Sequence, residues 1–211
     1  MFESRRQTSG EELANAISHG VALIAAVVAA IFLISGAAQA ELPEFVGIAV
    51  FSVSMICLYA ASTIYHGCTS DERKQFFDLL DHCAIYILIA GTYTPLAISV
   101  LEGYFGLLFL ALVWTLAIAG ISLKCFGRLK NSATSTAYYL LMGWLVLLII
   151  EPLRQALPAF VMKLLIAGGA AYTFGVFFYA AKQIRYGHLV WHLTIVVGTT
   201  FHFVAVALIT L

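Results

Sequence analysis

The amino-acid sequence predicts an all-α integral membrane protein, built as a bundle of seven transmembrane helices. Hydrophobic residues make up 62% of the 211 residues and charged residues only 10%, whereas charged residues make up about a quarter of a soluble domain. The mean hydropathy is +0.97. Apolar stretches recur along residues 1–211 with only short polar joints between them. We therefore expect a single membrane domain.

Seven apolar segments meet the requirement of about twenty residues per crossing. They are expected to be helices because the hydrocarbon layer offers no water to unpaired backbone groups. The front of the chain imitates a secretory signal peptide, but its apolar run is longer than the roughly 7–15 residues of a signal core. After a lead-in over residues 1–15, the expected spans are about 16–38, 45–65, 77–101, 106–123, 136–150, 160–181 and 188–211.

The polar joints that separate these spans differ in charge. The side of the first, third and fifth joints holds only two cations, Arg154 in the fifth joint and Lys163 at the start of the sixth span, together with several glutamates that include Glu102. The other nine of the eleven cations fall in the N-terminal tail and in the second, fourth and sixth joints: Arg5, Arg6, Arg73, Lys74, Lys124, Arg128, Lys130, Lys182 and Arg185. Cytoplasmic loops carry an excess of Lys and Arg. We therefore expect a cytoplasmic N-terminus and an external C-terminus.

Two other features limit the possible partners. The formal net charge is zero, which gives no reason to expect a nucleic-acid partner. The four cysteines, Cys57, Cys68, Cys83 and Cys125, form no close pair and do not predict a disulfide framework. We interpret them as small buried or reduced thiols, with Cys68 or Cys83 as an alternative stray metal ligand. Membrane lipids are the expected partners.

Three histidines and one aspartate fall at one depth near the predicted cytoplasmic side. His66 ends the second span, Asp81 lies near the start of the third, and His188 and His192 open the seventh. Ionisable side chains inside a span are costly and mark functional sites by default. Because all four converge on one layer, the pattern predicts a metal site. The alternative for any one of them alone is a hydrogen-bonded group in the bundle interior.

The spacing assigns a role to each of these residues. Ser62 and His66 are four residues apart, as are His188 and His192, so each pair shares a helix face. Zinc binds neutral imidazole, and a catalytic zinc site has three protein ligands and an open position. We expect His66, His188 and His192 to be the ligands of a zinc ion. Asp81 would act on water as a general base or hold it by a hydrogen bond, and Ser62 would orient a ligand or contact a substrate carbonyl.

Further polar residues are candidates for supporting roles around these ligands. Glu12, Asn15 and His19 follow one another at intervals of three and four on the way into the first span. They can support the metal site, or they can belong to an amphipathic lead-in at the headgroup layer. His82 points about 100° away from its neighbour Asp81 and is a secondary candidate.

His202 lies ten residues beyond the last predicted ligand, roughly 15 Å deeper in the membrane. This distance is too great for His202 to share the same ion, so we interpret it as a hydrogen-bonding group of the interior.

These residues resemble the hemolysin III family, the bacterial branch of the progestin and adipoQ receptor family that includes the adiponectin receptors. The resemblance covers nearly the whole chain. The matching segments are Glu12-Leu-Ala-Asn15-Ala-Ile-Ser-His19, Ala61-Ser62-Thr-Ile-Tyr-His66, Phe77-Asp-Leu-Leu-Asp81-His82, Ala90-Gly-Thr-Tyr-Thr-Pro95, His188-Leu-Val-Trp-His192 and Phe201-His202-Phe203.

The resemblance implies a multi-pass protein of the bacterial inner membrane with a cytoplasmic N-terminus. It also implies that His66, His188 and His192 bind zinc, that Asp81 contacts the ion through water, and that Ser62 is the motif serine. The family is similar to alkaline ceramidases, which implies hydrolysis of an amide or ester bond in a lipid.

The expected function is therefore that of a zinc-dependent membrane lipid hydrolase. One alternative is a non-catalytic protein that acts in lipid homeostasis or sensing. In that case the zinc ion would only stabilise the helix bundle. The other is a lytic or transport protein, although the outer half of the bundle offers few charges to line an aqueous channel. Replacing Asp81 by Asn discriminates the first two, since it should abolish hydrolysis and spare a structural site.

Overall fold

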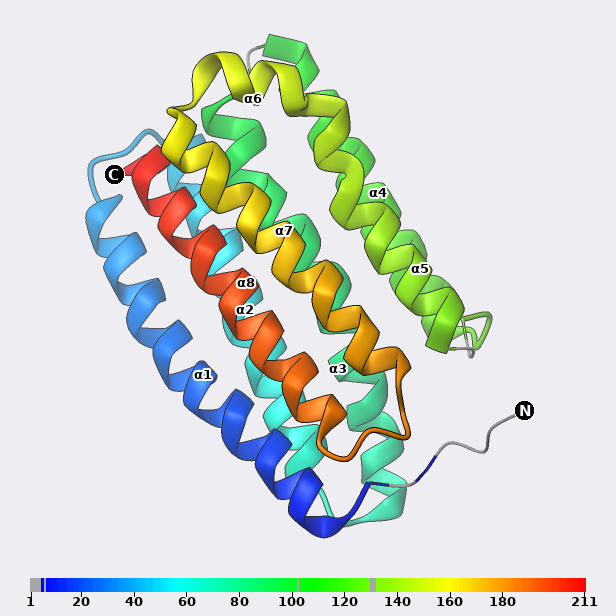
Figure 1. The fold of residues 1–211 in the computed structure, drawn as a ribbon. Coiled ribbons are helices and arrows are strands. Elements are labelled where there is room, and N and C mark those ends of the chain that lie inside the picture. Colours follow the sequence, from blue (N-terminus) through cyan, green and yellow to red (C-terminus); the bar gives the residue numbers. More distant parts are fainter. Residues whose placement is uncertain (1–4, 6, 102, 130–131) are drawn as a thin grey trace.

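The computed structural model describes residues 5, 7–101, 103–129 and 132–211, and in them it contains helices and no strand. Seven helices are long and apolar enough to cross a membrane, which confirms the predicted fold class. The start of α1 and the end of α8 lie at opposite ends of the bundle (Figure 1). The side that faces the cytoplasm remains a prediction. Three residues used to predict it, Arg6, Glu102 and Lys130, lie outside the described residues.

Six of the seven spans are continuous helices, and the fifth is built from three consecutive pieces. The continuous helices are α1 (Ser9–Gly36), α2 (Leu42–Gly67), α3 (Asp71–Ser99), α4 (Gly103–Cys125), α7 (Ala159–Ala180) and α8 (Gly187–Thr210). The fifth span consists of α5 (Ser132–Gly143), the 3₁₀ helix η1 (Trp144–Ile149) and α6 (Ile150–Ala156).

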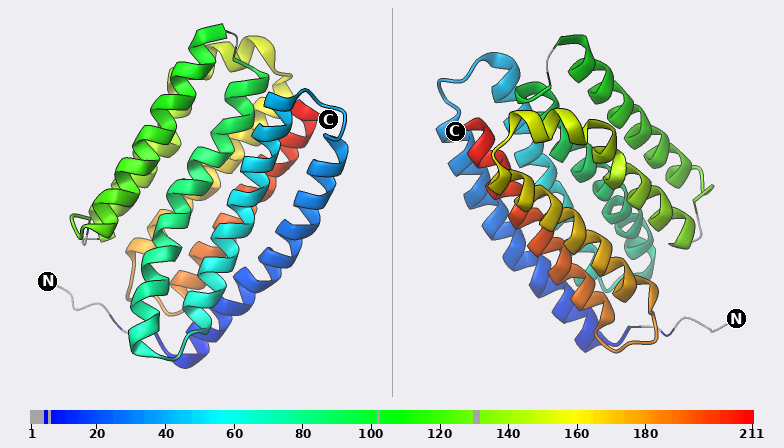
Figure 2. Two further views of the ribbon diagram at one scale, coloured as in Figure 1. Left: turned by 180° about the vertical axis from the view of Figure 1, so that it is seen from behind. Right: turned by 45° about the horizontal axis from the view of Figure 1, so that its top comes forward.

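The helices are arranged so that α1, α2, α3 and α8 meet near one end of the bundle. α2 packs against both α1 and α3, and α8 packs against α7 and α1 and also touches α2 and α3. The pair formed by α4 and α5 stands on the far side of α3 (Figure 2). The beginnings of α1, α3 and α8 and the end of α2 therefore enclose a common space.

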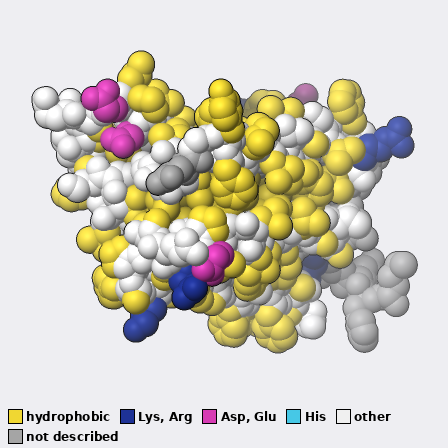
Figure 3. All heavy atoms as spheres, turned by 90° about the horizontal axis from the view of Figure 1, so that it is seen from above, with side chains coloured by type: hydrophobic (Ala, Val, Ile, Leu, Met, Phe, Trp, Pro, Cys, Tyr) yellow, Lys and Arg dark blue, Asp and Glu magenta, His cyan; other side chains and the backbone are white. Residues whose placement is uncertain are grey.

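The two faces of α1 show how the sequence meets a lipid environment. Apolar side chains at intervals of three and four are exposed on its outer face: Leu13, Ile17, Val21, Ile24, Val28 and Ile31. The opposite face is buried and begins with polar groups: Glu11, Asn15, His19, Ala22, Ala26, Ala30 and Leu33. This inverted pattern, with the polar groups inside, is the one that a helix needs where its outer surroundings are hydrocarbon. Seen from the upper end of Figure 1, hydrophobic side chains also cover much of the surface (Figure 3).

α1 starts at a capping box. The Thr8 side chain accepts a hydrogen bond from the Glu11 backbone N–H, and the Glu11 carboxylate accepts one from the Thr8 backbone N–H. This pairing satisfies N–H groups that a helix start otherwise leaves open. The Glu11 carboxylate also accepts a bond of 2.8 Å from the Tyr186 backbone N–H, in the turn before α8. One side chain therefore fixes the start of α1 to the start of α8.

One side chain of α3 forms hydrogen bonds with the backbone groups that the break in the fifth span leaves free. At η1 the regular ladder of helical hydrogen bonds is interrupted. The Tyr93 hydroxyl donates to the Gly143 carbonyl at 2.6 Å and accepts from the Val146 N–H at 2.9 Å. Freed backbone groups inside a membrane need such partners because no water is present.

α7 and α8 approach closely through glycine. A side chain at Gly168 would collide with the His202 ring, and one at Gly198 would collide with the Tyr172 ring. Small residues at such positions let membrane helices pack tightly. This packing positions His202 between α8 and α7.

Candidate metal centre

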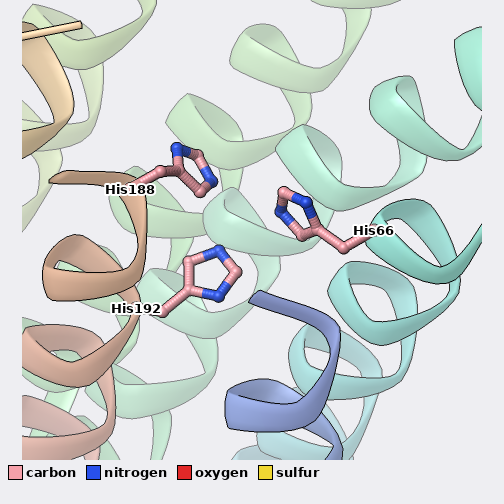
Figure 4. A group of neighbouring side chains, drawn as sticks. All are labelled: His66, His188 and His192. Carbon is pink, nitrogen blue, oxygen red and sulfur yellow. The ribbon is translucent and has the colours of Figure 1, made fainter. Parts of the chain in front are cut away.

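Three imidazoles converge where α2 ends and α8 begins. His66 lies in the last turn of α2, and His188 and His192 lie in the first two turns of α8. One ring nitrogen from each of the three lies within 4.8 Å of the others. The ring centroids are 5.0 Å apart for His66 and His188, 4.8 Å for His66 and His192 and 4.7 Å for His188 and His192. Figure 4 shows the three rings turned toward one shared space.

The donor set suits a metal ion with a preference for nitrogen ligands. His66 is 4% exposed and His192 is 2% exposed. The His66 Nε2 atom is buried and makes no hydrogen bond with any described residue. A buried polar atom without a partner is unusual, and a water or an ion is its usual partner. Three imidazoles in a buried cluster therefore fit the three-ligand sets of zinc.

Asp81 and Ser62 lie beside this cluster and not within it. The Ser62 hydroxyl is 1% exposed and is a neighbour of the Asp81 carboxylate. It nevertheless makes no well-formed hydrogen bond to a described residue. Both side chains line a cavity that is also lined by His188 and His192. The arrangement leaves a carboxylate and a hydroxyl available to a small molecule in that cavity.

The cavity is polar and has a volume of about 580 Å³. It lies between the first turns of α1, α3 and α8, the last turns of α2 and α7, and Lys124 of α4. An apolar pocket of about 380 Å³ adjoins it and runs among α3, α5, η1, α7 and α8. Four residues line both spaces: Leu58, Ile85, Trp191 and Ile195. The polar cavity and the apolar pocket are thus neighbours that share part of their lining.

Glu12 supports His66 directly. Its carboxylate accepts a hydrogen bond from His66 Nδ1 at 2.7 Å and one from Lys74 Nζ at 2.8 Å. The spacing of Glu12, Asn15 and His19 suggested a supporting role for Glu12. The structure places its carboxylate against the imidazole of His66. Nothing in the sequence pattern indicated Lys74 as its second partner.

His19 and Asn15 are also buried at this end of α1. The His19 ring lies parallel to the His192 ring, with centroids 3.6 Å apart, and edge-on to Tyr59. Both of its ring nitrogens are buried without a hydrogen bond to a described residue. Asn15 is 0% exposed and its Nδ2 donates to Gln7 Oε1. Both residues therefore face the inside of the bundle, next to the clustered imidazoles.

His82 and His202 lie outside the cluster. His82 lines the polar cavity, donates from Nδ1 to the Asp78 carbonyl at 2.8 Å and has Tyr179 Oη 3.5 Å from its Nε2. His202 lines the apolar pocket, and its Nε2 lies 3.2 Å from the Leu165 carbonyl oxygen. His202 is therefore an interior hydrogen-bonding group, as expected.

Sequence reasoning missed Ser18 and Glu11. The Ser18 hydroxyl lies 3.2 Å from His192 Nδ1, although Ser18 sits inside the segment that carries Asn15 and His19. Glu11 binds Arg5 through two nitrogen–oxygen contacts in addition to Tyr186. The repeated spacing of Glu11, Asn15, Ser18 and His19 at three and four residues is the signal that would have found both.

The chain is similar to known proteins over nearly its whole length. Residues 7–203 match the family model described as "Haemolysin-III related". The chain is 40% identical over 200 residues to the "Hemolysin-3 homolog" of Bacillus subtilis (strain 168), covering 94% of each chain. It is also 40% identical over 197 residues to "Hemolysin-3" of Bacillus cereus, covering 93% of this chain and 90% of that one.

A more distant similarity extends to an animal protein. The human "Monocyte to macrophage differentiation factor" is 22% identical over 209 residues, covering 95% of this chain and 85% of the relative. The matched region contains all of the clustered histidines.

Proposed function

Since this chain belongs to the haemolysin-III-related family of multi-pass bacterial membrane proteins, we propose that it is a zinc-dependent hydrolase of a lipid amide or ester bond. The observation that carries this proposal is the adjacency of two spaces. His188, His192, Asp81 and Ser62 line a polar cavity, and an apolar pocket beside it shares part of the same lining. Such a pairing suits a substrate with a polar acyl bond and a long tail.

His66, His188 and His192 are the residues that would hold the ion. A bound zinc ion supplies Lewis acidity toward an acyl carbonyl and toward water. The orphaned Nε2 of His66 supports this assignment because an imidazole nitrogen needs a partner when it is buried.

Asp81 and Ser62 are the groups that would act on the substrate. An ionised Asp81 carboxylate accepts hydrogen bonds only and can take a proton from a nearby water. The Ser62 hydroxyl, beside it, can donate to an acyl oxygen. Both are held on helices packed inside the bundle, so their positions relative to the three imidazoles are set by rigid elements.

The apolar pocket would hold the hydrocarbon tail. Its lining is almost wholly apolar, with Tyr93, Trp144 and Trp191 among the large side chains. Each buried methylene contributes about 0.8 kcal/mol. Tail binding in this pocket would therefore hold the acyl bond at the polar cavity, where the histidines lie.

A structural role for the metal is the second candidate, and the origin of the ligands favours it. The three imidazoles come from α2 and α8 alone, and these helices touch each other only slightly, since each packs mainly against other helices. An ion between them would join helices that otherwise share little contact. The protein would then act in lipid homeostasis or sensing without turnover.

Metal analysis together with a substrate panel tests the proposal. Purified full-length protein should contain about one zinc per chain and release fatty acid from ceramides, phospholipids or acyl amides. His192→Gln should lose both zinc and turnover, whereas His82→Gln, in the same cavity but outside the cluster, should keep zinc. Stoichiometric zinc without turnover on any of these lipids would favour the structural role, and the absence of bound zinc would overturn both.

A further inference from the structure

We propose that α1, which supplies none of the three clustered imidazoles, determines which nitrogen of two of them is free to bind metal. Glu12 acts on His66, and Ser18 acts on His192. The inference rests on the proposed metal site but concerns a property of the metal-free chain. Glu12 and Ser18 are thus positioning residues.

The property at stake is the tautomer of each ring. A neutral imidazole carries one N–H and one lone pair, and a metal takes the lone pair. A partner that accepts a hydrogen bond from one nitrogen leaves the other nitrogen free for the ion. Such partners commonly orient metal-binding histidines, and their loss typically costs about 10–100-fold in metal affinity.

For His66 the acceptor is a carboxylate. Glu12 Oε2 lies 2.7 Å from His66 Nδ1, and its other oxygen accepts from the Lys74 ammonium at 2.8 Å. A carboxylate paired with Lys74 has only lone pairs to offer, so the hydrogen must be on His66 Nδ1. In the neutral ring, the form that binds a metal, the lone pair is then on Nε2, the buried atom that has no partner among the described residues.

For His192 the acceptor is a hydroxyl that already donates its proton to another group. Ser18 Oγ donates to the Asn15 carbonyl at 2.8 Å and lies 3.2 Å from His192 Nδ1. A serine hydroxyl has a single proton. Since the carbonyl can only accept, that proton is directed at Asn15, and the contact with His192 must be donated by Nδ1. The lone pair of His192 is therefore on Nε2 as well.

His188 provides an internal comparison. No hydrogen bond from a described residue reaches its ring, which is surrounded by His66, His192 and Tyr179. α1 therefore fixes two rings and leaves the third to adapt. The placement of α1 against both α2 and α8 allows one helix to serve both rings.

Nuclear magnetic resonance of the metal-stripped, full-length protein in detergent tests this inference. Histidine labelled with nitrogen-15 reports which ring nitrogen carries the proton, and single histidine substitutions assign the signals. We expect Nδ1–H for His66 and His192 and a mixture for His188. Nε2–H on His66 or His192 in the unmodified chain would overturn the inference.

Two variants should have separate effects. Glu12→Ala should change the signal of His66 and leave that of His192, and Ser18→Ala should do the reverse. Glu12→Gln retains an amide oxygen that can accept from Nδ1, so it should preserve the tautomer of His66. Should Glu12→Ala fail to fold, the spectrum of the unmodified chain and the Glu12→Gln variant still decide.

Zinc affinity gives a second readout. Competition with a chelator should show losses of about 10–100-fold for Glu12→Ala and Ser18→Ala. Two matched controls should bind zinc normally: Glu151→Gln, which removes an exposed carboxylate paired with Arg154, and Thr200→Val, which removes an exposed hydroxyl bonded to the Val196 carbonyl. Unchanged affinity and unchanged spectra in Glu12→Ala and Ser18→Ala would overturn the inference. An unmodified chain with the expected tautomers but no zinc affinity would instead overturn only the proposed function.

Discussion

The His19 ring stacks face to face on the His192 ring, with centroids 3.6 Å apart and planes 8° from parallel. His19 is not one of the three imidazoles whose nitrogens converge. Its contact is therefore with the face of a converging ring and not with the shared space. We therefore expect His19 to hold the His192 ring in place. Substitutions at His19 can distinguish this role from that of a metal ligand.

His19→Phe should keep zinc affinity within about threefold, because a phenyl ring preserves the stack. His19→Ala should weaken zinc binding by up to about tenfold, since an aromatic pair contributes about 0.5–1.5 kcal/mol. Chelator competition on both purified variants checks this. Complete loss of zinc in His19→Phe would show that His19 is a ligand instead.

Asp81→Asn should reduce the rate of lipid hydrolysis by at least about 100-fold. It should leave the zinc content and the unfolding temperature close to those of the unmodified protein. The amide cannot take a proton from water, and general-base catalysis contributes about 10²–10⁴-fold. Turnover, metal content and thermal unfolding are measured on the same preparation. Hydrolysis that survives the substitution would remove Asp81 from the mechanism.

Gly169→Phe should block the apolar pocket without disturbing the histidines. Gly169 lines that pocket, and an added Cβ would meet no atom within 4 Å. Binding of a fluorescent fatty acyl probe should fall by roughly tenfold or more, since each excluded methylene contributes about 0.8 kcal/mol. Gly169→Ala is the matched control and should bind normally. Equal probe binding in both variants would place the tail elsewhere.

Tyr93→Phe should destabilise the protein by about 2 kcal/mol or more. The change removes one hydroxyl and leaves the Gly143 carbonyl and the Val146 N–H without their partner, and each unsatisfied buried group costs about 1–3 kcal/mol. Unfolding in detergent with increasing denaturant measures the loss. Tyr104→Phe, at a site that is 85% exposed, should have little effect. An equal loss of stability in both variants would argue that the Tyr93 hydroxyl does not stabilise the interrupted helix of the fifth span.

Zinc at about 100 times its dissociation constant should stabilise the unmodified protein by about 2.7 kcal/mol, because the ion binds only the folded state. His188→Ala should lose this stabilisation, and His82→Gln should retain it. Unfolding with and without added zinc measures the difference. Equal stabilisation in the two variants would mean that zinc binds outside the histidine cluster.

The fold and the three imidazoles could be predicted because their signals are local. Apolar runs of sufficient length indicate spans, and spacings of four residues place Ser62 with His66 and His188 with His192 on single helix faces. Four crossings, the third to the sixth span, separate the end of the second span from the start of the seventh, so both faces come to the same side of the membrane. No partner from another helix is needed for that step.

The remaining features depend on how helices rotate against one another. The contact of Ser18 with His192 joins residues 174 positions apart, and its existence is decided by the angle at which α1 meets α8. The break in the fifth span falls in the uniformly apolar run Trp144–Ile149, whose partner is a single hydroxyl on α3. Periodicity in the sequence carries no information about either contact.

The division of the imidazoles between α2 and α8 also has a consequence for biosynthesis. A ribosome delivers α2 to the membrane long before α8, and during that interval the nascent chain presents only His66 of the three. No partly made chain can therefore capture an ion with all three rings. Occupancy of the site by a metal would report that translation has passed α8 and that the two helices have met.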